Sequence, residues 1–384
     1  MVSQRCPLWE KISYANVSIE FAIALVLTNN FPQTTERINM AWIDKLLALT
    51  KNTLLECIRQ PVVLATAIVG MLLILLSVPF SAFTMEDDQR MFVDIGLSTI
   101  FMCGVILSAF LATGVVNREI ENRTVLTVIS KPVPRPLFVL GKFLGVSSVL
   151  LIVTMWLGLI FMLTELHGTL PTVTTPYNQP VLTFGFAALV IMFAAGVWCN
   201  FLYEWNFGAT VITLGLPLFM LAYCVCLIFK PDWAKAEIAT TFKPNLWKAL
   251  GMLMVAELVL GAIAVAVSTR LGQVLTLATV LATFMCGMLS DWLFARKLKQ
   301  LSDLMGKLPA ADQSWHDSMH LEWGFYKAMQ SVVPNFQLFW LSDALTQKKN
   351  IGFEYIATVV PYGFVLIVMA LALGTFLFQR REVG

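Results

Sequence analysis

An all-α fold that crosses a membrane several times is predicted by three observations on this sequence. Apolar residues make up 58% of the chain and charged residues only 13%, against roughly 45–50% and about 25% in ordinary soluble domains. The apolar residues are gathered in blocks of about 20 or more, the length that a helix needs to cross the hydrocarbon of a bilayer. Because lipid offers no hydrogen-bond partners, the backbone of each block must satisfy itself as a helix. We therefore expect a polytopic integral membrane protein.

The N-terminal part of the chain is expected to differ from this membrane domain. Residues 1–41 are interpreted as an extension, either a loosely ordered tail or the result of a start site upstream of Met40. A short apolar run there is interrupted by Glu20 and has no clear cleavage site, which argues against a signal peptide. Residues 42–60 carry apolar side chains near helical spacing, which predicts an amphipathic helix at the membrane surface, with a small soluble helix as the alternative. Residues 61–384 are expected to form the membrane domain.

Eight apolar blocks within this domain are predicted to be transmembrane helices. They are Pro61–Phe83, Met91–Val116, Phe143–Leu163, Val181–Leu202, Gly208–Phe229, Ala249–Thr269, Gln273–Phe294 and Tyr355–Phe378. Short polar segments separate the fourth block from the fifth and the sixth block from the seventh. Both pairs are therefore expected to form tight helical hairpins.

The lysine and arginine residues that flank the blocks predict that both termini are cytoplasmic, in the cell membrane. Three cations precede the first block and acidic residues dominate after it, which places the N-terminus inside. Those cations are Lys45, Lys51 and Arg59. Eight crossings return the C-terminus to the same side and place residues 117–142 there as well. The segment 295–354 then falls outside, although it begins with three cations, against the usual bias.

Several classes of function have little support in the sequence. A net charge of +2 predicts no nucleic-acid partner, and the seven cysteines form no C-x-x-C pair. His316 and His320 have a spacing that can hold zinc on a helix, but residues 308–320 are expected to be a loop and no third ligand is evident, so we predict no metal site. The stretch 332–343 is aromatic and too short to span, and is expected to lie at the membrane interface.

Residues 117–142 are the most unusual segment, because they place many charges and three prolines between two apolar blocks. The prolines lie between residues 132 and 136 and forbid continuation of a helix. Gly141 and Gly145 are four residues apart and allow close packing where the third block begins. We expect a helix bent back towards the membrane, followed by an extended connector.

The order of residues in this segment resembles that of the permeases of type-2 ATP-binding cassette (ABC) exporters. The pattern E-x-E-x-R-T-x-x-x-x-x-S-x-P-x-x-R-x-x-x-x-x-G-K runs from Glu119 to Lys142. The same plan continues in A-V-S-T-R-L-G-Q (266–273), V-V-P-N-F-Q-L-F-W-L-S-D-A-L (332–345) and F-Q-R-R-E (378–382). The likeness covers roughly residues 42–382. Such permeases usually have six spans, so the predicted hairpin Val181–Phe229 is a departure from the family pattern.

This resemblance implies that residues 117–142 dock on an ABC ATP-binding subunit and carry force from it to the helices. The coupling residues it implies are Arg118, Glu119, Glu121, Arg123, Thr124, Pro132, Arg135 and Lys142. The chain has no G-x-x-x-x-G-K-[S/T] loop to hold phosphates, so ATP and magnesium are expected in the partner. For this chain itself we expect neither enzymatic activity nor a cofactor. The resemblance also implies a dimer with a second permease copy or a paralogue in the lipid bilayer, exporting an unidentified substrate.

Glu257 is the one acid near the middle of the sixth block, where such a residue costs at least about 2.5 kcal/mol on insertion scales. Two interpretations remain for Glu257. It belongs to the transport path or to a conformational switch, or it forms a structural hydrogen bond to a neighbouring helix.

For the chain as a whole, two alternative functions remain open. An ion-coupled secondary transporter should show inverted repeats and broken helices, and a membrane-embedded enzyme should show paired catalytic groups at one depth.

Overall fold

The computed structural model describes residues 36–84, 88–121, 134–169, 177–305, 313–347 and 349–379. The chain divides into two compact units, residues 1–45 and 46–384. The described part of the first unit is the beginning of helix α2 (Glu36–Ile58), and all of the packing reported below lies within the second unit. The described residues are largely helical and contain no strand, only an isolated β-bridge between Phe229 and Lys235.

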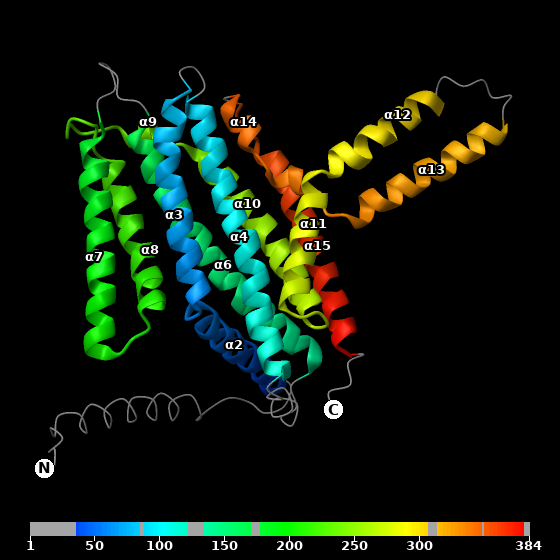
Figure 1. The fold of residues 1–384 in the computed structure, drawn as a ribbon, viewed down its shortest axis with the longest axis horizontal. Helices are drawn as coiled ribbons and strands as arrows, with labels where there is room; N and C mark the ends of the chain where they lie inside the picture. The colour runs from blue at the N-terminus through cyan, green and yellow to red at the C-terminus, as the bar shows by residue number, and fades with distance from the viewer. Residues whose placement is uncertain are drawn as a thin grey trace, which may run out of the picture. The chain divides into compact units, whose positions relative to one another are not determined.

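Seven helices in the described part of the chain are long and apolar enough to cross a membrane (Figure 1). They are α3 (Pro61–Ala82), α4 (Asp88–Glu121), α6 (Arg135–His167), α7 (Gln179–Tyr203), α8 (Phe207–Cys226), α10 (Pro244–Ser268) and α15 (Phe353–Gln379). An eighth crossing results if α11 (Gln273–Met288) is joined to the helical segments that follow it. The predicted all-α, polytopic membrane fold is therefore confirmed.

The sequence explains where several of these helices begin and end. Proline occupies one of the first two positions of α3, α6, α7 and α10, where its missing N–H removes no helical hydrogen bond. Between α7 and α8, Glu204 adopts the left-handed conformation with φ of 55° and ends the first helix. Asn206 then caps α8, because its side-chain oxygen accepts a hydrogen bond from the N–H of Ala209 at 3.0 Å. The tight hairpin expected here is present.

Helices α4, α6 and α10 form the centre of the bundle, since 78%, 78% and 67% of their most apolar stretches are buried. The corresponding values for α3, α7 and α15 are 33%, 22% and 17%, so these helices lie at the periphery. The additional hairpin packs on the centre through α8, where a Cβ added at Gly215 would lie 2.4 Å from Nε1 of Trp156 in α6. The peripheral helices leave broad apolar faces for lipid or another subunit.

The seventh predicted span, Gln273–Phe294, needs correction, because it is not one continuous helix. Helix α11 ends at Met288, a π-helical turn (η1, Asp291–Ala295) follows, and the helix axis bends by 49°. At the bend, Nδ2 of Asn335 donates a hydrogen bond to Oδ1 of Asp291 at 2.7 Å. These partners are 44 residues apart in the chain, so no local pattern could reveal the contact that accompanies the bend.

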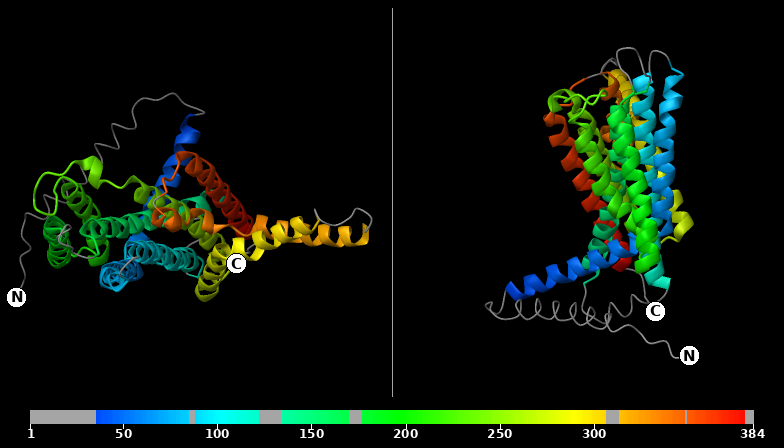
Figure 2. Two further views of the ribbon diagram at one scale, coloured as in Figure 1. Left: turned by 90° about the horizontal axis from the view of Figure 1, so that it is seen from above. Right: turned by 90° about the vertical axis from the view of Figure 1, so that its left-hand side faces the viewer.

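Beyond the bend, α12 (Arg296–Met305) and α13 (Gln313–Val332) form a hairpin that extends away from the other helices (Figures 1 and 2). The two helices pack on each other and on η1. The loop predicted for residues 308–320 is therefore wrong from Gln313 onward. Periodicity did not reveal this helix because its surroundings in the sequence are polar.

Two rings of the aromatic segment that follows α13 are buried inside the protein, while its position at the membrane interface stays a prediction. Phe336 and Phe339 of the 3-10 helix η2 (Phe336–Phe339) are fully buried. The ring of Phe336 lies 6.5 Å from the rings of Phe101 in α4 and Phe284 in α11, measured between centroids. The short helix α14 (Ser342–Thr346) then leads to α15. These rings find partners within the bundle, which the sequence alone could not show.

The bundle has two ends that differ in their contents. At one end, which we call the α2 end, residues 46–58 of α2 lie where α4 and α15 finish and α6 begins (Figures 1 and 2). At the other, the α9 end, lie the short helix α9 (Ile238–Thr241), the end of α6 and the beginnings of α4 and α10 (Figure 1).

Candidate functional site

Helices α2 and α6 approach each other closely at the α2 end. A Cβ added at Gly141 would lie 2.5 Å from the side chain of Leu49, and one at Gly145 would lie 2.5 Å from that of Thr53. Residues four apart lie on the same face of a helix, so the two glycines together form a flat surface against α2. A larger side chain at either position would force the two helices apart.

Lys142, one of the predicted coupling residues, is fully buried at this joint. Its Nζ lies 3.9 Å from Oε2 of Glu56 in α2 and 5.6 Å from the ring centre of Phe138. A buried ammonium group is costly unless it is paired, so the ion pair links the two helices. Burial also raises the pKa of the neighbouring Cys57 thiol to about 12, with Glu56 adding to the shift and Lys142 opposing it. The thiol therefore stays protonated at neutral pH.

The last turn of α15 receives two arginines from distant parts of the chain. Nη1 of Arg135, the first residue of α6, donates a hydrogen bond to the carbonyl oxygen of Gln379 at 2.8 Å. Nε of Arg270, in the turn between α10 and α11, donates to the carbonyl oxygen of Leu377 at 2.9 Å. The final carbonyls of a helix lack partners within it and carry partial negative charge. Two guanidinium groups therefore anchor the end of α15 to α6 and to the α10–α11 turn.

These contacts bring together three of the sequence patterns that were noted as separate features. The pattern of residues 117–142 supplies Arg135, the pattern of residues 266–273 supplies Arg270, and the pattern of residues 378–382 begins at the bound end of α15. Arg270 lies in a turn that was predicted and Glu56 on the polar face of the predicted interfacial helix, but no partner was predicted for either residue. An arginine directly after a span and an acid on an interfacial helix were the available signals, but neither identifies its partner.

The other predicted coupling residues lie at the end of α4 or outside the described residues. Helix α4 continues to Glu121, beyond the predicted end of the second span at Val116. The backbone is helical at Arg118, Glu119 and Glu121, while Arg123, Thr124 and Pro132 lie outside the described residues. The coupling role of this set stays a prediction.

Glu257 is fully buried in α10, between α4 and α6. Thr154 of α6 donates a hydrogen bond to its Oε2, while Oε1 has no hydrogen-bond partner among the described residues. Gly104 of α4 makes room for this side chain, since a Cβ added there would lie 2.3 Å from Cδ of Glu257. The bond to Thr154 is the interhelical contact that a structural role requires. A role in the path or in switching stays a prediction.

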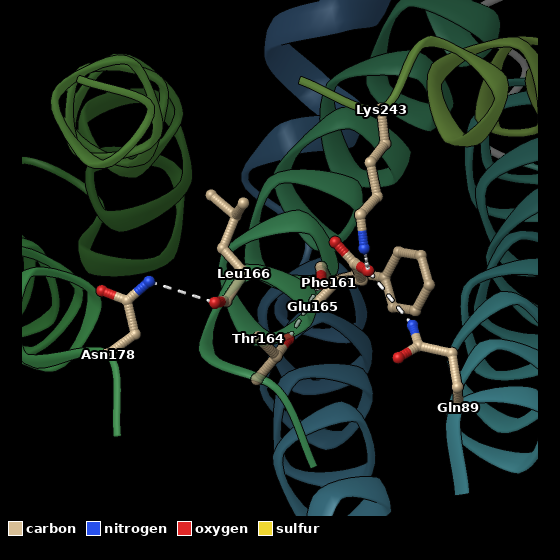
Figure 3. A network of polar contacts seen from close by, with 7 residues as sticks. All are labelled: Gln89, Phe161, Thr164, Glu165, Leu166, Asn178 and Lys243. Carbon is tan, nitrogen blue, oxygen red and sulfur yellow. Dashed lines mark hydrogen bonds and ion pairs between the residues drawn. The ribbon is translucent and has the colours of Figure 1, made fainter. Parts of the chain in front are cut away.

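At the α9 end, Glu165 of α6 is held between α4 and the residue that precedes α10 (Figure 3). Lys243 forms an ion pair with Oε1 of Glu165, and Nε2 of Gln89 donates to the same oxygen at 3.1 Å. The Glu165 side chain is only 3% exposed, whereas that of Lys243 is 52% exposed. Nearby, Nδ2 of Asn178 donates to the carbonyl oxygen of Leu166 at 3.1 Å. No sequence pattern predicted this network, although its charged members lie near the edges of predicted spans.

Comparison with protein families gives a match over nearly the whole chain. The family model described as ABC-2 family transporter protein matches residues 22–383. A search of curated proteins found no match. The matched range includes both ends of the bundle and Glu257. Among the described residues, no group of three or more histidine, cysteine or acidic side chains is arranged to hold a metal ion.

Proposed function

Because this chain belongs to the ABC-2 family of transporter proteins, we propose that it exports a substrate across the cell membrane with energy from a separate ATP-binding subunit. Family membership makes the chain an ABC permease, a multi-pass membrane subunit that is not itself catalytic. Members of this family typically work with an ATP-binding subunit. The outward direction, the cytoplasmic position of both termini and the identity of the partner are parts of the proposal.

The contacts of α6 at the α2 end carry this proposal. Helix α6 begins at Arg135, within the segment 117–142 that is proposed to dock on the ATP-binding subunit, and Arg135 binds the end of α15. About two turns later, Lys142 pairs with Glu56 of α2. A displacement of the segment would therefore act on α2, α6 and α15 together. Charged groups on such a segment suit the task, because ion pairs across an interface fix its register.

The remaining parts of the proposal concern the organisation of the chain. Residues 1–41 are taken as an extension, residues 42–60 as the interfacial helix and residues 61–384 as the permease domain, with 117–142 on the cytoplasmic side and 295–354 outside. ATP and Mg²⁺ would be bound by the partner, because this chain has no phosphate-binding loop.

We also propose that two permease chains, identical or paralogous, form the transport path between them within the bilayer. A groove of about 600 Å³ lies along α3 and α4, outside the packed centre. Its lining is mainly apolar and includes four polar residues, Thr66, Asp94, Ser98 and Thr99. Polar residues in a groove that is otherwise apolar support a role for this face in the path.

Joint purification with an ABC ATP-binding subunit encoded beside this chain tests the proposal. The chain alone should show no ATP turnover, and the complex should show turnover that depends on Glu119 and Glu121. The double variant Glu119→Lys/Glu121→Lys should stay in the membrane but lose assembly, since removing one partner of a buried interfacial charge pair commonly costs about 2–5 kcal/mol. The control is Asp303→Lys/Glu322→Lys, which reverses two exposed acids on α12 and α13. Equal assembly and turnover in both double variants would refute the coupling role.

A further inference from the structure

A cavity of about 780 Å³ lies at the α9 end, beside the Glu165 network. It is formed by the first turns of α4 and α10, the last turn of α6 and the end of α14. Figure 3 shows how Gln89 and Lys243 converge on Glu165 from two sides of this region. Its charged lining residues are Asp88, Arg90, Glu165, Lys243 and Lys349. Among the described residues, three cations and two carboxylates line the cavity, an excess of one positive charge.

The contacts within the cavity show which of these charges are free to meet a ligand. Glu165 is paired with Lys243, and Oδ2 of Asp88 accepts a hydrogen bond from Oγ1 of Thr169 at 2.5 Å. Arg90 and Lys349 are exposed and form no salt bridge with any residue that the structure describes. Both carboxylates are therefore engaged, while two cations have no anionic partner in the part of the chain that the structure describes.

Two further features of the lining favour an anion that carries an apolar part. Helices α4 and α10 both begin at the cavity, and the N-terminal end of a helix adds partial positive charge. Between the charged groups, the lining contains the apolar side chains of Val93, Phe242 and Leu246. The volume also lies within the range of about 300–1,000 Å³ that is usual for small-ligand pockets.

We propose that this cavity binds an organic anion of the carboxylate or phosphate class. Its charged end lies between Arg90 and Lys349, and its apolar part contacts Phe242 and its neighbours. Glu165 tunes the site, because it neutralises Lys243 and keeps that cation from the ligand. The ligand is either a water-soluble anion or the headgroup of an anionic lipid. This site is separate from the proposed coupling segment, so it stands or falls independently of the proposed function.

Calorimetric titration with phenyl phosphate tests the proposal, with the full chain in phosphatidylcholine nanodiscs and empty nanodiscs as the blank. Saturable binding that weakens as salt is added is expected, because salt screens exposed charges. Arg90→Gln/Lys349→Gln should weaken binding about tenfold or more, the usual effect of losing hydrogen bonds to charged groups. Lys235→Gln removes an exposed lysine that does not line the cavity and should leave binding unchanged. Absence of saturable binding, or equal binding by the double variant and the wild type, would overturn the proposal.

The Glu165–Lys243 pair supplies a test in which two variants change binding in opposite directions. Glu165→Gln removes a negative charge and frees Lys243, while the amide oxygen can still accept from Gln89, so binding should tighten by about threefold or more. Lys243→Gln leaves Glu165 without its cation and should weaken binding. A purely structural role would impair both variants alike, and that result would contradict the tuning role. Size-exclusion profiles check that both variants are folded.

A comparison of membrane compositions identifies the source of the anion. If the ligand is a lipid headgroup, phosphatidylglycerol in the nanodiscs should compete with phenyl phosphate in the wild type and have little effect in Arg90→Gln/Lys349→Gln. If the ligand is water-soluble, phosphatidylglycerol should change the binding of phenyl phosphate only slightly, and equally in the wild type and the double variant. Either pattern, together with saturable binding by the wild type, supports an anion site.

Discussion

At the α2 end of the bundle, three cations are held by other parts of the protein: Lys142 is buried against Glu56, and Arg135 and Arg270 bind the backbone of α15. At the α9 end, half of the Lys243 side chain is exposed and Arg90 faces a cavity. The first arrangement joins helices. The second leaves charge available. Residues of the same chemical type thus hold helices together at one end and are placed to receive a ligand at the other.

This difference agrees with the proposed direction of force through the molecule. A permease driven by a separate ATPase needs strong contacts between its helices where the ATPase acts. Three such contacts lie at the α2 end, namely those of Lys142, Arg135 and Arg270. At the α9 end, the ion pair of Glu165 and Lys243 is partly exposed and lies beside a cavity. Four predictions test whether the two ends differ as described. The first concerns the centre of the bundle and gives a reference value for the loss of stability when a fully packed site is disturbed.

The largest effect is expected at Gly104 in the centre. Gly104→Val places atoms where Glu257 lies, and overpacking of a buried site costs typically about 1–3 kcal/mol and sometimes more. We expect a value of about 3 kcal/mol and a low yield of monodisperse protein, measured by size exclusion and by chemical unfolding in micelles. Glu257→Gln is the matched control, because its amide oxygen keeps the hydrogen bond from Thr154. Normal stability of Gly104→Val would show that the centre is loosely packed.

The second largest effect is expected at the α2 end. Glu56→Leu leaves the buried Lys142 without this partner, and breaking a buried pair by removing one member costs about 3–5 kcal/mol. Because Glu56 is 32% exposed, we expect about 2–3 kcal/mol in chemical unfolding. Adding Lys142→Met should restore most of the loss, since a buried ion pair is often replaced by apolar residues at little cost. If the double variant is no more stable than Glu56→Leu, the pair is not what holds α2 to α6.

A smaller effect is expected at the end of α15. Arg135→Gln and Arg270→Gln should each cost about 1 kcal/mol, because both hydrogen bonds are exposed to solvent. The sensitive measurement is hydrogen exchange, which should become faster in the last turn of α15. Arg296→Gln removes an exposed arginine on α12 and serves as the control. Unchanged exchange in the double variant Arg135→Gln/Arg270→Gln would mean that the arginines do not anchor this helix.

The smallest effect is expected at the α9 end. Glu165→Gln should lower stability by less than about 1 kcal/mol, because Lys243 is half exposed and can be hydrated when its partner is lost. The comparison with Glu56→Leu is the decisive measurement, made by chemical unfolding under one set of conditions. Equal losses at Glu56 and Glu165 would remove the distinction between the two ends.

The helices could be predicted from the sequence to within a few residues at many of their ends. Helix α3 was expected at Pro61–Phe83 and occupies Pro61–Ala82, because a proline start and an apolar block are local signals. The bend after Met288 and the burial of Phe336 could not be predicted in this way. Both involve contacts between segments that are far apart in the chain. For the same reason, the candidate residue Lys142 could be named but not its partner Glu56.

By itself the sequence determined that this protein is a multi-pass, all-α membrane protein with a charged segment after its second span. Apolar length and the need to satisfy the backbone in lipid are properties of each block alone. Only the tertiary structure decided what individual charges do. Lys142 belongs to the same pattern as Glu119, yet the close approach of α6 to α2 at Gly141 places it in the interior beside Glu56. The role of a charge depends on which helix lies next to it, and that is set by packing between distant parts of the chain.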